Sequence, residues 1–184
     1  MEATKVRSRA DTLACIYENV KMGADSIVNL LPKVEDTRLK SDMSVQLSGY
    51  EEFAARARKE LQEMGVEAEE KGFMTKAMAK VGMEFNTMMD TSISHIAEMM
   101  IQGSNMGIVE MNKLLNTCER CDSEDGAVGL AREIVAFEEK NLERMKKYLC
   151  FFLLAVMVMG CFSGCSVADN RTVINVYNWG QYIS

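Results

Sequence analysis

Apolar residues recur every three or four positions through most of the first 149 residues, and this spacing limits the fold more than any other feature. Residues at that spacing share one face of an α-helix, so each such segment predicts a helix with one buried stripe. The stripes comprise Leu13, Ile16, Val20, Ala24, Ile27 and Leu31; Leu47, Tyr50, Phe53, Ala57, Leu61 and Met64; Met74, Met78, Val81, Phe85 and Met88; Ile93, Ile96, Met100, Ile108 and Leu115; and Val128, Ala131, Ile134, Val135, Phe137, Leu142 and Met145.

The expected helix boundaries coincide with residues that end or begin helices. Pro32 follows the first stripe and cannot continue a helix, and Gly65 is a plausible cap after the second. Residues 90–92 (Asp-Thr-Ser) are typical helix starts, and 116–126 has the polar composition of a loop. The sequence therefore predicts an all-α antiparallel bundle, with a further helical segment at about 72–89 as the crossover.

The distribution of charge divides the chain into parts. With 27 acidic and 21 basic residues the chain is acidic, and it has no basic block suited to a phosphate backbone, so nucleic acid is not an expected partner. Residues 150–184 carry only Asp169 and Arg171, so the net charge of −6 belongs to residues 1–149. We expect a helical bundle over 1–149, a hydrophobic segment over 145–165 and a short tail over 166–184.

A metal site is one interpretation of the acidic residues in the expected helices. Two-metal bundles present a Glu from each of two helices and a Glu-x-x-His pair from each of the others. The single histidine, His95, precedes Glu98 in the reverse order. The predicted iron or manganese ligands are Glu18, His95, Glu98 and Glu133, with Glu51 or Glu52 and Glu138 as alternative carboxylates. The competing interpretation is a metal-free bundle in which His95 makes an ordinary hydrogen bond.

Two cysteines form a second candidate site. Cys118 and Cys121 have the C-x-x-C spacing that suits a metal, a disulfide or redox-active thiols, whereas incidental thiols in a loop are the competing interpretation. A structural zinc needs four ligands, and the bundle has no second pair, with Cys15 its only other cysteine. The abundant methionines are expected to fill the core.

The segment DTSISHIAEMMIQGSNMGIVEMNKLL, with EEFAARARKELQEMG before it and AREIVAFEEKNLERMKKYL after it, resembles a family of ferritin-like proteins of unassigned function from anaerobic Firmicutes. The resemblance covers about residues 1–149. It implies a ferritin-like helical bundle and no established activity.

The C-terminal segment has a different resemblance. From Met145 onward, Lys146 and Lys147, an apolar stretch and Phe-Ser-Gly-Cys ending at Cys165 resemble a bacterial lipoprotein signal, in which Cys165 would carry the lipid. The following VYNWGQYIS resembles the first strand of spermidine/putrescine-binding proteins of ABC transporters. This resemblance implies polyamine contacts for Trp179 and Tyr182. Because only about 20 residues match, the truncated tail is not expected to bind polyamines.

The hydrophobic segment has two further interpretations. Residues 148–168 are uncharged and long enough for a membrane anchor that leaves the bundle in the cytoplasm, since basic residues precede them. Alternatively, the last helix simply continues through Val158. A fusion of two reading frames would explain the joined resemblances.

These features favour a non-enzymatic ferritin-like bundle, cytoplasmic and capable of forming a homo-oligomer. A metal-binding bundle and a polyamine-transport component are the alternatives.

Overall fold

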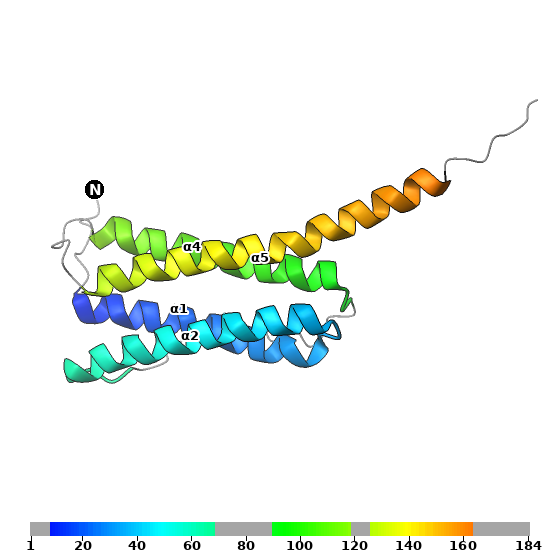
Figure 1. Ribbon diagram of the computed structural model, residues 1–184. Helices are drawn as coiled ribbons and strands as arrows, with labels where there is room; N and C mark the ends of the chain where they lie inside the picture. Colours follow the sequence, from blue (N-terminus) through cyan, green and yellow to red (C-terminus); the bar gives the residue numbers. More distant parts are fainter. Residues whose placement is uncertain (1–7, 69–89, 119–125, 164–184) are drawn as a thin grey trace, which may run out of the picture.

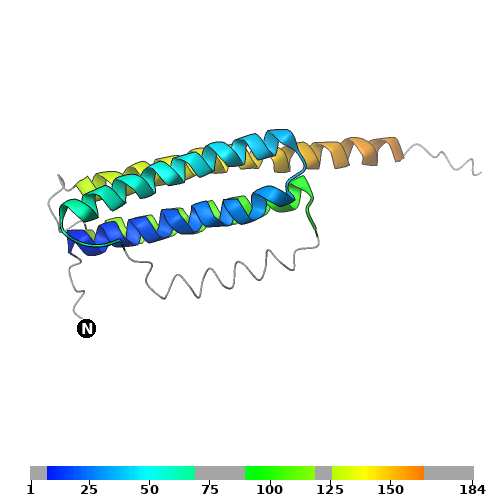
Figure 2. The same cartoon turned by 90° about the horizontal axis from the view of Figure 1, so that it is seen from below.

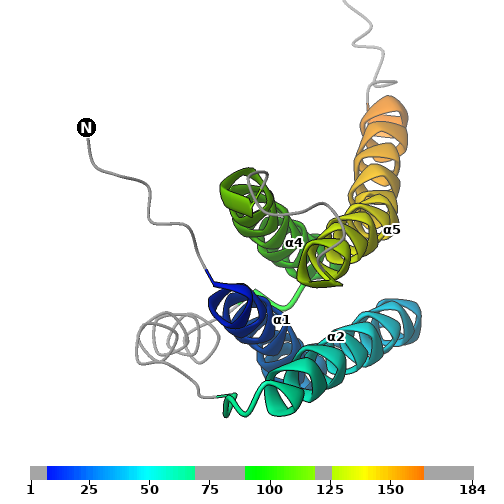
Figure 3. The ribbon, with the colours of Figure 1, turned by 90° about the vertical axis from the view of Figure 1, so that its left-hand side faces the viewer.

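The computed structural model describes residues 8–68, 90–118 and 126–163, and four long helices account for most of them. The elements are α1 (Arg9–Leu30), a 3-10 turn η1 (Leu31–Lys33), α2 (Thr37–Glu63), α4 (Ile93–Cys118) and α5 (Gly126–Ser163). Helix α1 packs mainly against α2, and α4 packs mainly against α5 (Figures 1 and 3). The two hairpins stack into an antiparallel bundle, which confirms the predicted all-α fold.

Local sequence signals explain where the helices begin and end. Asp36 caps α2, because its Oδ1 accepts a hydrogen bond of 2.7 Å from the backbone nitrogen of Leu39. Pro32 lies in the 3-10 turn just after α1, and Gly65 follows α2 with a φ of 71°, so both predicted helix ends are confirmed. At the start of α4, Ser92 Oγ accepts a 3.3 Å hydrogen bond from the backbone nitrogen of His95. The expected crossover helix at 72–89 lies outside the described residues.

The inward faces of the helices form one continuous apolar core. Leu13 and Ile16 on α1, Leu39 on α2, Ile96 on α4 and Ile134 on α5 are all buried in it. An aromatic cluster ties the two hairpins together: the Phe137 ring makes edge-to-face contacts with Tyr50 and Phe53 of α2. Burial of these stripes is what holds the bundle, because isolated helices gain little stability from hydrogen bonding alone.

Helix α5 runs from Gly126 to Ser163 without a break at residues 145–149, and its last part extends beyond the ends of the other described helices (Figures 1 and 2). The apolar stretch is thus helical and continues the last bundle helix through Val158. Among the residues that the structure describes, no helix is both long and apolar enough to cross a membrane. Cys165 and the tail at 166–184 lie outside the described ranges.

Candidate functional site

A cluster of polar side chains interrupts the apolar core at its centre, and each of the four helices contributes to it. Its buried members are Asn19 on α1, Gln46 and Tyr50 on α2, Ser104 on α4, and Glu138 and Asn141 on α5. The sequence contains a signal for their burial, because each of these residues stands at helical spacing from the apolar residues of a buried stripe. Glu138, for example, follows buried Ile134 by four residues and precedes buried Met145 by seven.

A chain of hydrogen bonds joins three of the helices through this cluster. Gln46 Nε2 donates to Ser104 Oγ (3.2 Å) and to the hydroxyl of Tyr50 (3.1 Å). The Tyr50 hydroxyl in turn donates to Glu138 Oε1 at 2.6 Å. Because an amide nitrogen can only donate, the chain has one direction and ends on the carboxyl group of Glu138.

The cluster is incompletely satisfied. Side-chain atoms Gln46 Oε1, Glu138 Oε2 and Asn141 Nδ2 are buried and have no hydrogen-bond partner within the described part of the chain. Only 1% of Gln46 and 1% of Glu138 is exposed, so bulk water does not compensate them. An unsatisfied buried acceptor costs about 1–3 kcal/mol, so these atoms are expected to bind a water molecule or a ligand.

The buried position changes the acid–base properties of both ionisable groups in the cluster. Burial raises the pKa of Glu138, although the hydrogen bond from Tyr50 and the nearby polar groups of Ser104 and Asn141 partly oppose the shift. Burial, together with the adjacent Glu138 carboxylate, raises the pKa of Tyr50 well above its usual value. Tyr50 therefore remains protonated and serves as a hydrogen-bond donor.

Two glycines allow these side chains to approach the neighbouring helices closely. A Cβ at Gly107 would lie 2.9 Å from Glu138 Oε1, and a Cβ at Gly23 would lie 2.7 Å from the Tyr50 ring. Larger residues at either position would displace the polar side chain that now lies there.

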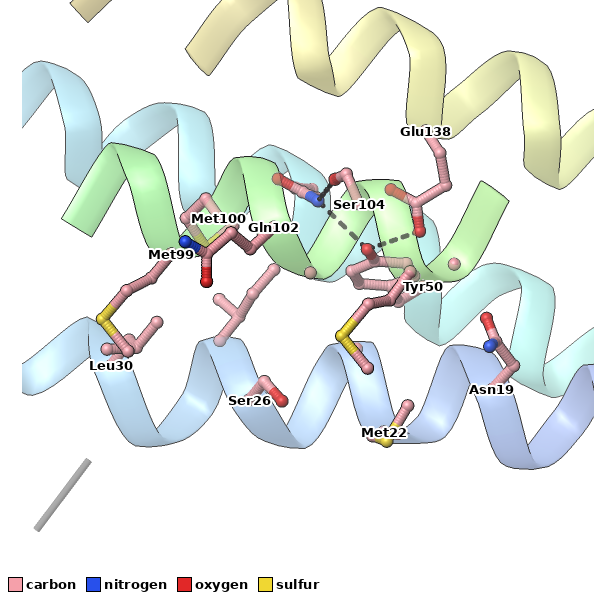
Figure 4. A pocket seen from close by; sticks show the side chains of 16 residues that line it. Asn19, Met22, Ser26, Leu30, Tyr50, Met99, Met100, Gln102, Ser104 and Glu138 are labelled. Atoms are coloured by element: carbon pink, nitrogen blue, oxygen red, sulfur yellow. Dashed lines mark hydrogen bonds between the residues drawn. The ribbon is translucent and has the colours of Figure 1, made fainter. Parts of the chain in front are cut away.

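A cavity of about 160 Å³ adjoins the cluster. It lies between α1 and α4, and Gln46 and Tyr50 from α2 and Glu138 from α5 complete its wall (Figure 4). Much of the remaining lining is apolar or small: Met22, Gly23, Ile27, Leu30, Met99, Met100, Gly103, Met106 and Gly107. On the α4 side the lining residues Gln102, Gly103 and Met106 are exposed, with Met106 at 60%. The site thus combines an apolar chamber with buried hydrogen-bonding groups in its wall, as small-molecule sites generally do.

The structure distributes the four predicted metal ligands along the bundle. His95 and Glu98 lie near the start of α4, at the end of the bundle where α1 ends (Figure 1). Glu133 lies near the opposite end, because α5 begins where α1 begins, and it forms a two-pronged ion pair with Arg56 (2.6 and 3.0 Å). Glu18 lies in the first half of α1. No group of three or more histidine, cysteine, aspartate or glutamate side chains in the described ranges could hold a metal ion.

The chemistry of the central cluster does not fit a two-metal centre. Ferritin-like carboxylate proteins direct several glutamates and histidines into the bundle at this level. Here the buried polar residues of the described helices include one carboxylate, Glu138, which Tyr50 already engages; the others are amides and hydroxyls. Glu138 was only an alternative to Glu133 in the sequence interpretation. Sequence alone did not distinguish the buried glutamate from the exposed one.

The described part of the structure includes only one residue of the thiol pair. Cys118 is the last residue of α4, and Cys121 lies outside the described ranges. Trp179 and Tyr182 also lie outside them, so their predicted roles stay predictions.

No protein-family model matches the sequence, and no curated protein is significantly similar to it. Among solved structures, the chain is similar to the bacterioferritin-related protein of Bacteroides fragilis, which is described as a dodecameric thioferritin. The TM-score is 0.66, with 11% sequence identity over 84% of this chain and 91% of that chain. At this level of identity the similarity concerns the fold. The chain has a ferritin-like helical-bundle fold, as its resemblance to ferritin-like proteins implied.

Proposed function

We propose that this protein is a non-enzymatic ferritin-like bundle that binds a small organic molecule in its central cavity. The observation that carries this proposal is the pairing of an apolar chamber with buried, unpartnered polar atoms on Gln46 and Glu138 in its wall. A volume of about 160 Å³ is close to that of the ~150 Å³ engineered cavity that holds benzene. The ligand class is therefore a molecule of about five to seven non-hydrogen atoms.

The four methionines of the lining, Met22, Met99, Met100 and Met106, provide a direct test. In protein labelled with ¹³C at the methionine methyl groups, added n-butanol is expected to shift these signals saturably. Met43, which is buried but does not line the cavity, is expected to stay unchanged.

A blocking variant makes the test specific. A Cβ at Gly103 has no atom within 4 Å, so Gly103→Leu can place a side chain at the cavity without a backbone clash. This variant is expected to abolish the n-butanol shifts. The matched control is Gly129→Leu on α5, where the Cβ is equally open but the residue does not line the cavity. Equal n-butanol binding by Gly103→Leu and wild type would overturn the proposal.

Iron or manganese binding is the alternative function, and the fold similarity to a bacterioferritin-related protein favours it. Metal analysis of protein purified from its native cells tests it. Stoichiometric iron or manganese that disappears in His95→Ala would support the predicted ligand set of Glu18, His95, Glu98 and Glu133. The same metal content in wild type and His95→Ala would exclude His95.

We also expect a homo-oligomer, because the structurally similar Bacteroides fragilis protein is dodecameric. Three helices carry exposed apolar side chains that could contact another copy: Val28, Val45 and Met106. Light scattering on the purified full chain measures the oligomeric state, and a monomer at all concentrations would contradict the expectation.

A further inference from the structure

We propose that the cavity selects a short aliphatic amine, bound as its ammonium ion between the carboxyl group of Glu138 and the side-chain oxygen of Gln46. This inference rests on the proposed small-molecule binding and adds the chemical class of the ligand.

The two unpartnered atoms of the cavity-lining residues are both acceptors. They are Glu138 Oε2 and Gln46 Oε1. A ligand that satisfies both must offer at least two donors from one small group. An ammonium group has three donors and no acceptor, whereas an alcohol has one donor. The number of free acceptors therefore favours an amine.

The lack of a cationic side chain beside Glu138 in the described residues also favours an amine ligand. Glu138 is 1% exposed, and no salt bridge to it is present among the described residues. The groups that face it from the other helices are neutral: Tyr50 on α2, Ser104 on α4 and, at the wall beside Gly107, Asn19 on α1. Burial disfavours the ionised form of Glu138, and a cationic ligand beside it would stabilise the carboxylate.

The hydrogen-bond chain fixes the orientation of the Glu138 carboxyl group and of the Gln46 amide. Tyr50 donates to Glu138 Oε1 at 2.6 Å, and Ser104 and Asn141 also lie near the carboxyl group, whose Oε2 has no hydrogen-bond partner among the described residues. Gln46 uses its nitrogen on Tyr50 and Ser104, and its oxygen likewise has no partner there. Figure 4 shows Glu138 reaching from α5 toward Tyr50, with Met22 and Met99 of the apolar chamber on the facing helices. The methionine-rich chamber suits the alkyl part of the ligand.

The test compares n-butylamine with n-butanol, which have the same chain length and differ in the terminal group. Both are titrated near neutral pH into the full-length protein, with the methionine methyl signals as the readout. Wild type is expected to bind n-butylamine at least about tenfold more tightly, as charge-assisted hydrogen bonds are roughly twice as strong as neutral ones. Glu138→Gln is expected to lose this preference, because a neutral amide no longer attracts the ammonium ion more strongly than it attracts the hydroxyl group.

The outcomes separate this inference from the proposed function. If n-butanol binds but n-butylamine binds no more tightly to wild type, the amine inference is overturned and small-molecule binding stands. If neither probe shifts the methionine signals, both proposals fail. The wild-type comparison does not depend on the folding of any variant. A preference that persists unchanged in a folded Glu138→Gln protein would also overturn the assignment to Glu138.

Discussion

The hydroxyl of Tyr50 donates a hydrogen bond of 2.6 Å to Glu138 Oε1 and so joins the α1/α2 hairpin to the α4/α5 hairpin inside the core. Both residues are nearly inaccessible to solvent. An apolar pair would pack here without any need for a partner. The polar pair instead makes the relative position of the two hairpins depend on one directional contact.

Replacement of Tyr50 by Phe measures the value of this contact. The ring is retained, but Glu138 and Gln46 each lose a buried partner, so the free energy of unfolding is expected to fall by about 1–3 kcal/mol. Urea denaturation followed by circular dichroism measures the change.

The matched control is Tyr148→Phe. Tyr148 also donates to a carboxylate, Asp42 Oδ2 at 2.7 Å, but this pair is only partly buried and water can replace the lost partner. The expected loss is within about 1 kcal/mol. Equal losses in the two variants would show that the Tyr50–Glu138 contact has no special role in stability.

The stability of the bundle is expected to depend on pH through Glu138. Its pKa is raised by burial in the folded state, so folding retains a proton that the unfolded chain releases more easily. The stabilising contribution is complete below the usual glutamate pKa and is lost as the pH rises through the raised folded value. Glu138→Gln removes this contribution, so it is expected to gain stability relative to wild type as the pH rises above the usual glutamate pKa and through the raised folded value.

Glu133 provides a control of opposite sign. Arg56 lowers its pKa, so its contribution is present above the usual glutamate pKa and is lost as the pH falls through the lowered value. Because the Glu133 side chain is 52% exposed, the effect of Glu133→Gln is expected to be small. Parallel profiles of unfolding free energy against pH for wild type and Glu138→Gln would contradict the assignment of this pH dependence to Glu138.

Gly23 is expected to be intolerant of even one methyl group. In Gly23→Ala the new Cβ would lie 2.7 Å from the ring of Tyr50, which cannot move without disturbing its bond to Glu138. We expect a loss of about 1–3 kcal/mol, typical of overpacking. Gly129→Ala has no atom within 4 Å of the new Cβ, and alanine should stabilise α5 by up to about 1 kcal/mol. Thermal denaturation of the two variants compares them, and stabilisation by both would contradict the packing at Gly23.

The fold could be predicted to a large extent because helix formation and helix burial are local. Leu13, Ile16 and Val20 lie on one face of a helix whatever surrounds them, and Pro32 and Gly65 end helices through their own backbone geometry. The relative positions of the predicted metal ligands could not be derived in this way, because the sequence does not give the position of one helix along another. In the structure, Glu133 and His95 lie near opposite ends of the bundle.

The sequence by itself determined that the chain forms amphipathic helices, where most of them end and that they must pack together. Only the tertiary structure decided which polar residues meet in the centre. Gln46, Tyr50, Ser104 and Glu138 are separated by up to 92 positions along the chain, and their contacts depend on the register and rotation of three helices. Such contacts follow from the packing of whole helix faces, which no local pattern specifies.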